Sequence, residues 1–135
     1  MITQTACTIF KVNLLNGAED FTTGYKMALY TALADLNADT LAYTTSNEIS
    51  GTGYTPGGET LTNIVPTSSN NVAYISFDTV VWNPASFTAR GALIYNSVTN
   101  AAVAVLDFGS DKTATNTFTV TFPAATSSSA VIRLA

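Results

Sequence analysis

The chain has 135 residues, of which 47% are hydrophobic, 10% aromatic and 10% charged, a composition typical of one folded domain with a weakly charged surface. It contains no histidine and one cysteine, which excludes a Ser-His-Asp triad, a histidine metal site and an internal disulfide. Five basic residues against nine acidic ones give a net charge of −4, so nucleic acid is not an expected partner.

No membrane-spanning segment is expected from the sequence. Its longest apolar run, residues 101–106, is far shorter than the roughly 20 residues that a transmembrane helix needs. The N-terminal residues show no basic stretch followed by an apolar core, so no secretory signal is expected either. We therefore expect synthesis in a cytoplasm and no membrane partner.

The first predicted element is a short helix over residues 9–15. Thr8 is placed to cap its start, and Gly17 follows its end, where a residue with positive φ is common. A helix of this length must be held by packing against the rest of the chain. Residues 1–8 before it are predicted to form a flexible arm, and Cys7 is predicted to be a small buried side chain.

Strands are predicted for most of the remaining chain, because it is rich in threonine, serine, valine and aromatic residues in short runs. In chain order, we expect them at residues 25–31, 60–65, 72–77, 80–82, 87–96, 101–108, 117–122 and 131–134. The clearest is 117–122, in which Phe118, Val120 and Phe122 alternate with threonines. Turns at 68–71 and 97–100 predict two antiparallel hairpins, the first joining 60–65 to 72–77 and the second joining 87–96 to 101–108.

The number and spacing of these strands predict the fold class. We expect an all-β chain, with a single antiparallel β-sandwich or jelly-roll-like domain over residues 1–135, a short N-terminal helix and one long glycine-rich loop. Residues 93–95 and 103–106 are apolar on both faces of their strands, so something must cover the second face. The cover is expected to be the short helix, a second sheet with a loop, or another subunit.

The long loop is predicted at residues 44–59, which contain four glycines and a proline. Loops of this length usually have a binding role. The alternative is a folded loop in which the glycines supply positive φ and in which Ile49 and Tyr54 anchor the loop to the body of the domain.

No catalytic site, cofactor or metal is expected. The carboxylates Glu48, Glu59, Asp78 and Asp107 are available for glycoside hydrolysis, but nothing in the sequence brings two of them to the separation that this reaction needs. The glycines of residues 51–58 fit neither the dinucleotide nor the P-loop spacing. Residues 107–111 lack the closing acidic residue of a calcium loop, and we predict a tight turn there as the chain leaves its strand.

Arg90 lies inside the apolar stretch of residues 87–95. Its guanidinium is therefore expected either to pair with a carboxylate or to point from a sheet edge into a partner. Glu48, Asp78 and Asp107 are the candidate partners. We favour an internal structural ion pair between Arg90 and Glu48, because that pair would attach the long loop to the sheet.

Several blocks of the chain resemble, in the same order, a group of small virion proteins of tailed bacteriophages. The blocks are Phe10-Lys-Val-Asn-Leu-Leu-Asn-Gly17, Tyr25-Lys-Met-Ala-Leu-Tyr-Thr31, Tyr43-Thr-Thr-Ser-Asn-Glu-Ile-Ser-Gly-Thr-Gly-Tyr-Thr-Pro-Gly-Gly58, Phe87-Thr-Ala-Arg-Gly-Ala-Leu-Ile-Tyr-Asn96 and Val105-Leu-Asp-Phe-Gly-Ser-Asp-Lys112. Together they cover most of the chain. The family is described mainly as structural.

The resemblance implies a non-enzymatic building block of the virion. Among virion roles we favour a capsid decoration or cement protein, bound on the capsid surface as a dimer or trimer across joints between major capsid subunits. The expected partners are the major capsid protein and copies of the chain itself. Residues 1–8 and 48–59 would reach over the capsid, with Tyr54 and Trp82 as aromatic anchors and Glu48 and Glu59 beside them.

Two alternatives stay open. One is a tail, neck or fibre component of the same particle, with a surface that binds a receptor. The other is a carbohydrate-binding module that uses Tyr54, Trp82 and a bound calcium ion.

Overall fold

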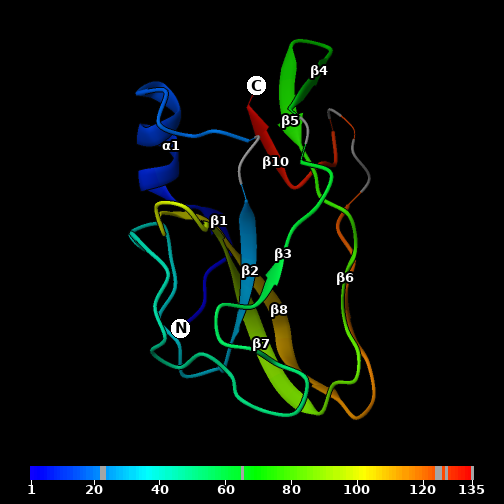
Figure 1. Ribbon diagram of the computed structural model, residues 1–135. Helices are drawn as coiled ribbons and strands as arrows, with labels where there is room; N and C mark the ends of the chain where they lie inside the picture. Colours follow the sequence, from blue (N-terminus) through cyan, green and yellow to red (C-terminus); the bar gives the residue numbers. More distant parts are fainter. Residues whose placement is uncertain (22–23, 65, 124–125, 127, 135) are drawn as a thin grey trace.

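The computed structural model describes residues 1–21, 24–64, 66–123, 126 and 128–134 (Figure 1). These residues confirm the all-β fold class, a sandwich-like arrangement of antiparallel sheets with one short helix. The elements are β1 (Thr5–Ala6), α1 (Thr8–Leu15), β2 (Tyr25–Tyr30), β3 (Glu59–Thr60), β4 (Thr67–Ser69), β5 (Val72–Ile75), β6 (Val80–Trp82), β7 (Phe87–Asn96), β8 (Ala102–Ala114), β9 (Phe118–Val120) and β10 (Ile132–Leu134).

The described strands form three sheets. The largest has the order β1-β8-β7-β2-β3, and its centre is the long hairpin of β7 and β8. The other two sheets have the orders β10-β5-β4 and β6-β9. In Figure 1, β6 runs beside the large sheet, and β4, β5 and β10 gather at the end that also carries α1.

The hairpin of β7 and β8 confirms the predicted turn at residues 97–100, whereas the other predicted hairpin is wrong in its first strand. The hairpin partner of β5 is β4, not residues 60–65. Asn70 and Asn71 both have positive φ, of 52° and 65°, and a two-residue turn of this kind sets the register directly from the turn. Thr60 belongs instead to β3 beside β2, and Val65 lies outside the described residues.

The predicted turn at residues 107–111 is also wrong, because β8 continues through it to Ala114. Asp107 lies opposite Gly91 and Lys112 lies opposite Ala89, so four residues of β8 bulge out against one residue of β7. The Asp107 carboxylate accepts a hydrogen bond from the N–H of Gly109 at 2.9 Å, and Gly109 has a φ of 82°. The turn signal in the sequence therefore produces a bulge inside a strand.

Helix α1 begins one residue earlier than predicted. Its N-cap is Cys7, which makes no side-chain cap hydrogen bond. Thr8 is the first residue of the helix and not its cap, and its N–H donates to the carbonyl of Ala38 at 2.9 Å. The predicted end is confirmed: Gly17 has a φ of 69°, and its N–H and that of Ala18 donate back into the last turn.

The N-terminal segment is packed against the domain, so the prediction of a flexible arm is wrong. Ile2 is buried and forms a bridge with Leu36, and the Thr3 N–H donates to the Leu36 carbonyl at 2.9 Å. Cys7 is fully buried, as predicted. Burial raises the pKa of its thiol to about 11, which keeps the thiol protonated at neutral pH.

Both faces of the large sheet are covered from within the chain. On one face, the Tyr95 ring stacks on Tyr43 at 4.7 Å, and the Tyr30 hydroxyl donates to the Thr44 carbonyl at 2.6 Å. On the opposite face, Phe21 stacks on Tyr25 at 5.3 Å and meets Phe10 of α1 edge-on. The loop and the helix thus cover opposite faces of β2 and β7, whereas Leu106 of β8 is only partly buried.

Candidate functional site

Trp82 and Tyr54, the predicted aromatic anchors, lie in the core of the domain. Trp82 is 1% exposed and packs against Tyr54, Phe87 and Phe118. In β6, Val80 and Trp82 point inward while Val81 points outward, because side chains alternate along a strand. The prediction of exposed aromatic anchors at these two positions is therefore wrong.

Glu48 organises the long loop by accepting hydrogen bonds. Its carboxylate accepts from the Tyr43 hydroxyl at 2.7 Å, the Tyr54 hydroxyl at 2.5 Å and the Gly57 N–H at 2.8 Å. The Tyr54 hydroxyl also accepts from the Leu29 N–H at 3.0 Å. This arrangement confirms the folded-loop alternative, in which Tyr54 and the buried Ile49 anchor the loop.

The electrostatics around Glu48 follow from burial. Burial raises the pKa of Tyr54 and of Tyr43 above the ordinary value, and the negative charge of Glu48, with its hydrogen bonds, raises both further. Protonated tyrosine hydroxyls are the donors that this carboxylate needs. Glu48 and its tyrosines are therefore a structural tether that holds the long loop on the domain.

The favoured ion pair between Arg90 and Glu48 is wrong. Arg90 Nε lies 3.5 Å from Asp107 Oδ1, so the pair joins β7 to the bulge of β8. Asp107 was one of the sequence candidates; it pairs with Gly91 at the start of the bulge, next to Arg90 in the sequence of β7. Glu59, the remaining predicted site residue, is exposed on β3.

Asp78 has its own partners, away from these residues. Its carboxylate accepts hydrogen bonds from Asn63 and Thr62 beside a shallow hollow of about 420 Å³. Among the described residues, no three histidine, cysteine or acidic side chains gather closely enough to hold a metal ion. Within the same residues, no helix is long and apolar enough to cross a membrane.

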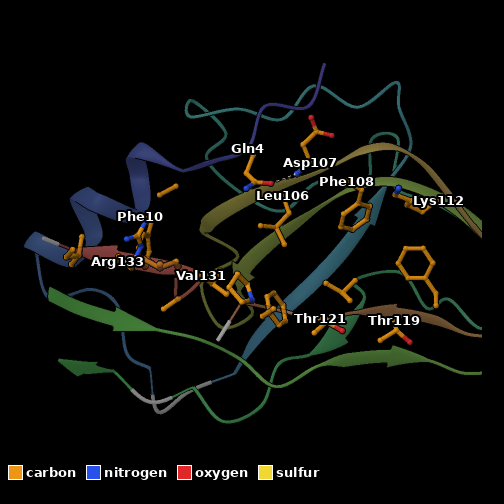
Figure 2. Close-up of a pocket in the computed structure, with 18 of the residues that line it drawn as sticks. Gln4, Phe10, Leu106, Asp107, Phe108, Lys112, Thr119, Thr121, Val131 and Arg133 are labelled. Carbon is orange, nitrogen blue, oxygen red and sulfur yellow. Dashed lines mark hydrogen bonds between the residues drawn. The ribbon is translucent and has the colours of Figure 1, made fainter. Parts of the chain in front are cut away.

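A groove of about 1040 Å³ lies between β8 and the segments that carry β9 and β10 (Figure 2). It is lined by Gln4, Ala6, Phe10, Lys11, Val72, residues 106–108, Lys112, Thr113, residues 117–123 and residues 130–134. A volume of this size is at the upper end of what small-molecule pockets reach. The groove is therefore large enough for a polypeptide segment.

Apolar side chains form much of the groove. Leu106 and Phe108 line it from β8, and Val131 lines it from the opposite side (Figure 2). All three are partly buried. Apolar surface left accessible in a concave site is typical of a surface that binds a partner.

The charges of the groove differ from those of the whole chain. Lys11, Lys112 and Arg133, three of the five basic residues of the chain, line it, against one of the nine acidic residues, Asp107. Asp107 is already paired with Arg90. Figure 2 shows Arg133 toward one end of the groove and Lys112 toward the other. A protein with a net charge of −4 thus has a positively charged groove.

No protein-family model matches this chain, and no curated protein or solved structure matches it either.

The groove could not be predicted from the sequence, because the residues that line it are far apart in the chain. The walls come from residues near 4–11, 106–113, 117–123 and 130–134, and the three cations are separated by up to 122 positions, from 11 to 133. The one pattern in the sequence that concerns the groove is the alternation of residues 117–122. It predicts a strand with threonines on the outer face and apolar residues on the inner face.

Proposed function

We propose that this chain is a non-enzymatic structural protein of a tailed bacteriophage particle, namely a capsid decoration or cement protein. The groove between β8 and β9–β10 supports the proposal, because it offers an apolar, positively charged surface of polypeptide size. In this role the groove holds part of a neighbouring subunit. The resemblance of the sequence blocks supplies the setting, a phage virion.

A cement protein stabilises a shell by adding contact area between neighbouring subunits. A standard protein interface buries about 1,600 Å² in total, so a chain of 135 residues has surface for more than one such contact. In the proposed arrangement one contact uses the groove, and another joins copies of the chain into a dimer or trimer. Opening the shell then requires both contacts to break.

The proposed attachment to the capsid uses the groove and not the segments predicted from the sequence. Residues 1–8 and 48–59 are attached to the domain by backbone hydrogen bonds, and Tyr54 and Trp82 are buried. These residues therefore support the fold, and the groove takes over the proposed role of gripping the capsid.

The copy number of the chain in purified particles tests this proposal. A shell protein is expected at a copy number comparable to that of the major capsid protein, measured by quantitative mass spectrometry. A handful of copies per particle would contradict the proposal and favour a tail, neck or fibre component. Absence from particles would contradict every virion role.

A further inference from the structure

We infer that the groove binds an extended, acidic segment of a neighbouring subunit by strand addition. The inference deepens the proposed function and rests on it for the origin of the segment. The groove brings together open strand edges, apolar side chains and positive charge, and each of these features restricts the kind of occupant.

The strand edges that line the groove are incompletely paired among the described residues. Strand β9 pairs with β6 alone, and β10 pairs with β5 alone. Strand β1 lies at the end of the large sheet and pairs with β8 at Ala104 and Val105, and the Asp107 N–H donates to the side-chain oxygen of Gln4 at 3.2 Å. Open edges expose N–H and C=O groups that another extended chain can pair with.

The apolar part of the groove favours a segment with alternating side chains. An extended segment points successive residues to opposite sides, so one set of side chains can contact Leu106, Phe108 and Val131. The other set then faces the solvent or the rim of the groove. Alternation of apolar and polar residues is the pattern that this surface accepts.

The charge of the groove selects acidic residues for the second set. Lys11, Lys112 and Arg133 are exposed and line a groove whose single carboxylate is already paired. Positive groups near both ends attract an anionic segment and repel a basic one. A second copy of this chain carries the same net charge of −4, but its acidic residues belong to folded loops and strands, so the occupant is a segment of another protein.

The direct test uses synthetic peptides and the purified full chain. The probe is a labelled eight-residue peptide in which aspartate alternates with valine, and binding is measured by fluorescence polarisation at low salt. A peptide in which lysine alternates with valine is the charge control. A third peptide repeats the aspartate and valine pattern with methylated backbone nitrogens, which cannot donate hydrogen bonds to a strand edge.

The expected result is binding of the aspartate peptide, with at least about tenfold weaker binding of the lysine peptide and of the methylated peptide. Amide hydrogen exchange should slow at residues 117–123 or 130–134 when the first peptide binds. Equal binding of the lysine peptide, no effect of methylation, or no binding of the aspartate peptide would overturn the inference.

A matched pair of variants locates the site. In the first variant, Lys112→Gln and Arg133→Gln remove two positive charges from exposed groove positions. In the second, Thr45→Asp and Ser50→Asp change the net charge by the same amount at exposed positions outside the groove. The first should weaken binding of the aspartate peptide about tenfold and the second only slightly; equal weakening would contradict the groove as the site.

The copy number measurement separates failure of this inference from failure of the proposed function. If the peptides do not bind but the chain is abundant in the shell, strand addition is wrong and the cement role stands. If the peptides bind as expected and the chain is absent from particles, the groove is a peptide site in another setting.

Discussion

The Glu48 carboxylate holds the long loop on the domain, although the length and glycine content of the loop also suggested a free binding surface. It accepts hydrogen bonds from two tyrosine hydroxyls and one backbone N–H, and through Tyr54 it reaches the backbone of β2. The sequence pointed to Glu48 as a tether but named the wrong partner. A neutral tyrosine hydroxyl is not recognisable in a sequence as the partner of a carboxylate, whereas the charge of Arg90 is. The sequence therefore favoured an ion pair.

Replacing Glu48 by glutamine tests the tether. The Glu48→Gln variant turns one acceptor oxygen into an N–H₂ group facing donors, so we expect a loss of about 1–3 kcal/mol in the free energy of unfolding. Urea denaturation measures it. The control is Glu59→Gln, at an exposed residue at the end of the same loop, with an expected change within about 0.5 kcal/mol. Equal losses in the two variants would contradict the tether.

Buried phenols and the buried thiol predict how stability depends on pH. Burial raises the pKa of Cys7 to about 11 and raises the pKa values of Tyr25, Tyr30, Tyr54 and Tyr95 above the ordinary value. Above about pH 9 these groups lose protons in the unfolded chain but keep them in the folded chain. The unfolded state then binds fewer protons, so the free energy of unfolding falls as the pH rises.

Urea midpoints across an alkaline pH series check this expectation. The midpoint should be nearly constant between about pH 7 and 8 and should fall progressively above about pH 9. Tyrosinate absorbance from the buried tyrosines with raised pKa values should appear only as the chain unfolds. A midpoint that stays level or rises up to about pH 11 would contradict the burial of these groups.

At the scale of the elements, the sequence predicted strands better than their partners. Residues 80–82 and 87–96 match β6 and β7, because runs of β-branched and aromatic residues report local conformation directly. Pairing depends on turn geometry and on contacts between distant residues. Asn70 and Asn71 therefore selected β4 over residues 60–65, and Gly109 produced a bulge where a chain reversal was expected.

A glycine of the long loop gives a test at this scale. Gly58 has a φ of 80°, and an added Cβ would overlap the carbonyl of Met27 in β2. We expect Gly58→Ala to lower the free energy of unfolding by more than about 2 kcal/mol. Chemical denaturation measures the change.

The matched control for this test is Gly17→Ala. Gly17 also has positive φ, of 69°, but nothing lies within 4 Å of an added Cβ. Its expected loss is about 1 kcal/mol, from backbone conformation alone. If Gly58→Ala were no more destabilising than Gly17→Ala, the close packing of the loop on β2 would be contradicted.

At the scale of the whole molecule, the fold class was predictable and the candidate site was not. The alternation of residues such as Phe118 and Val120 predicts a half-buried strand in any all-β fold. Whether such a strand has one neighbour or two depends on the complete topology. Among the residues that the structure describes, β9 and β10 each pair with one strand, and no local sequence pattern predicts this.

The most direct test of the central claim is a cryo-EM map of the assembled particle. We expect the chain on the shell, with an extended acidic segment of a neighbouring subunit lying in the groove between β8 and β9–β10. A map in which the chain occupies the shell but the groove faces solvent would contradict strand addition. A map with no copy of the chain on the shell would contradict the cement role.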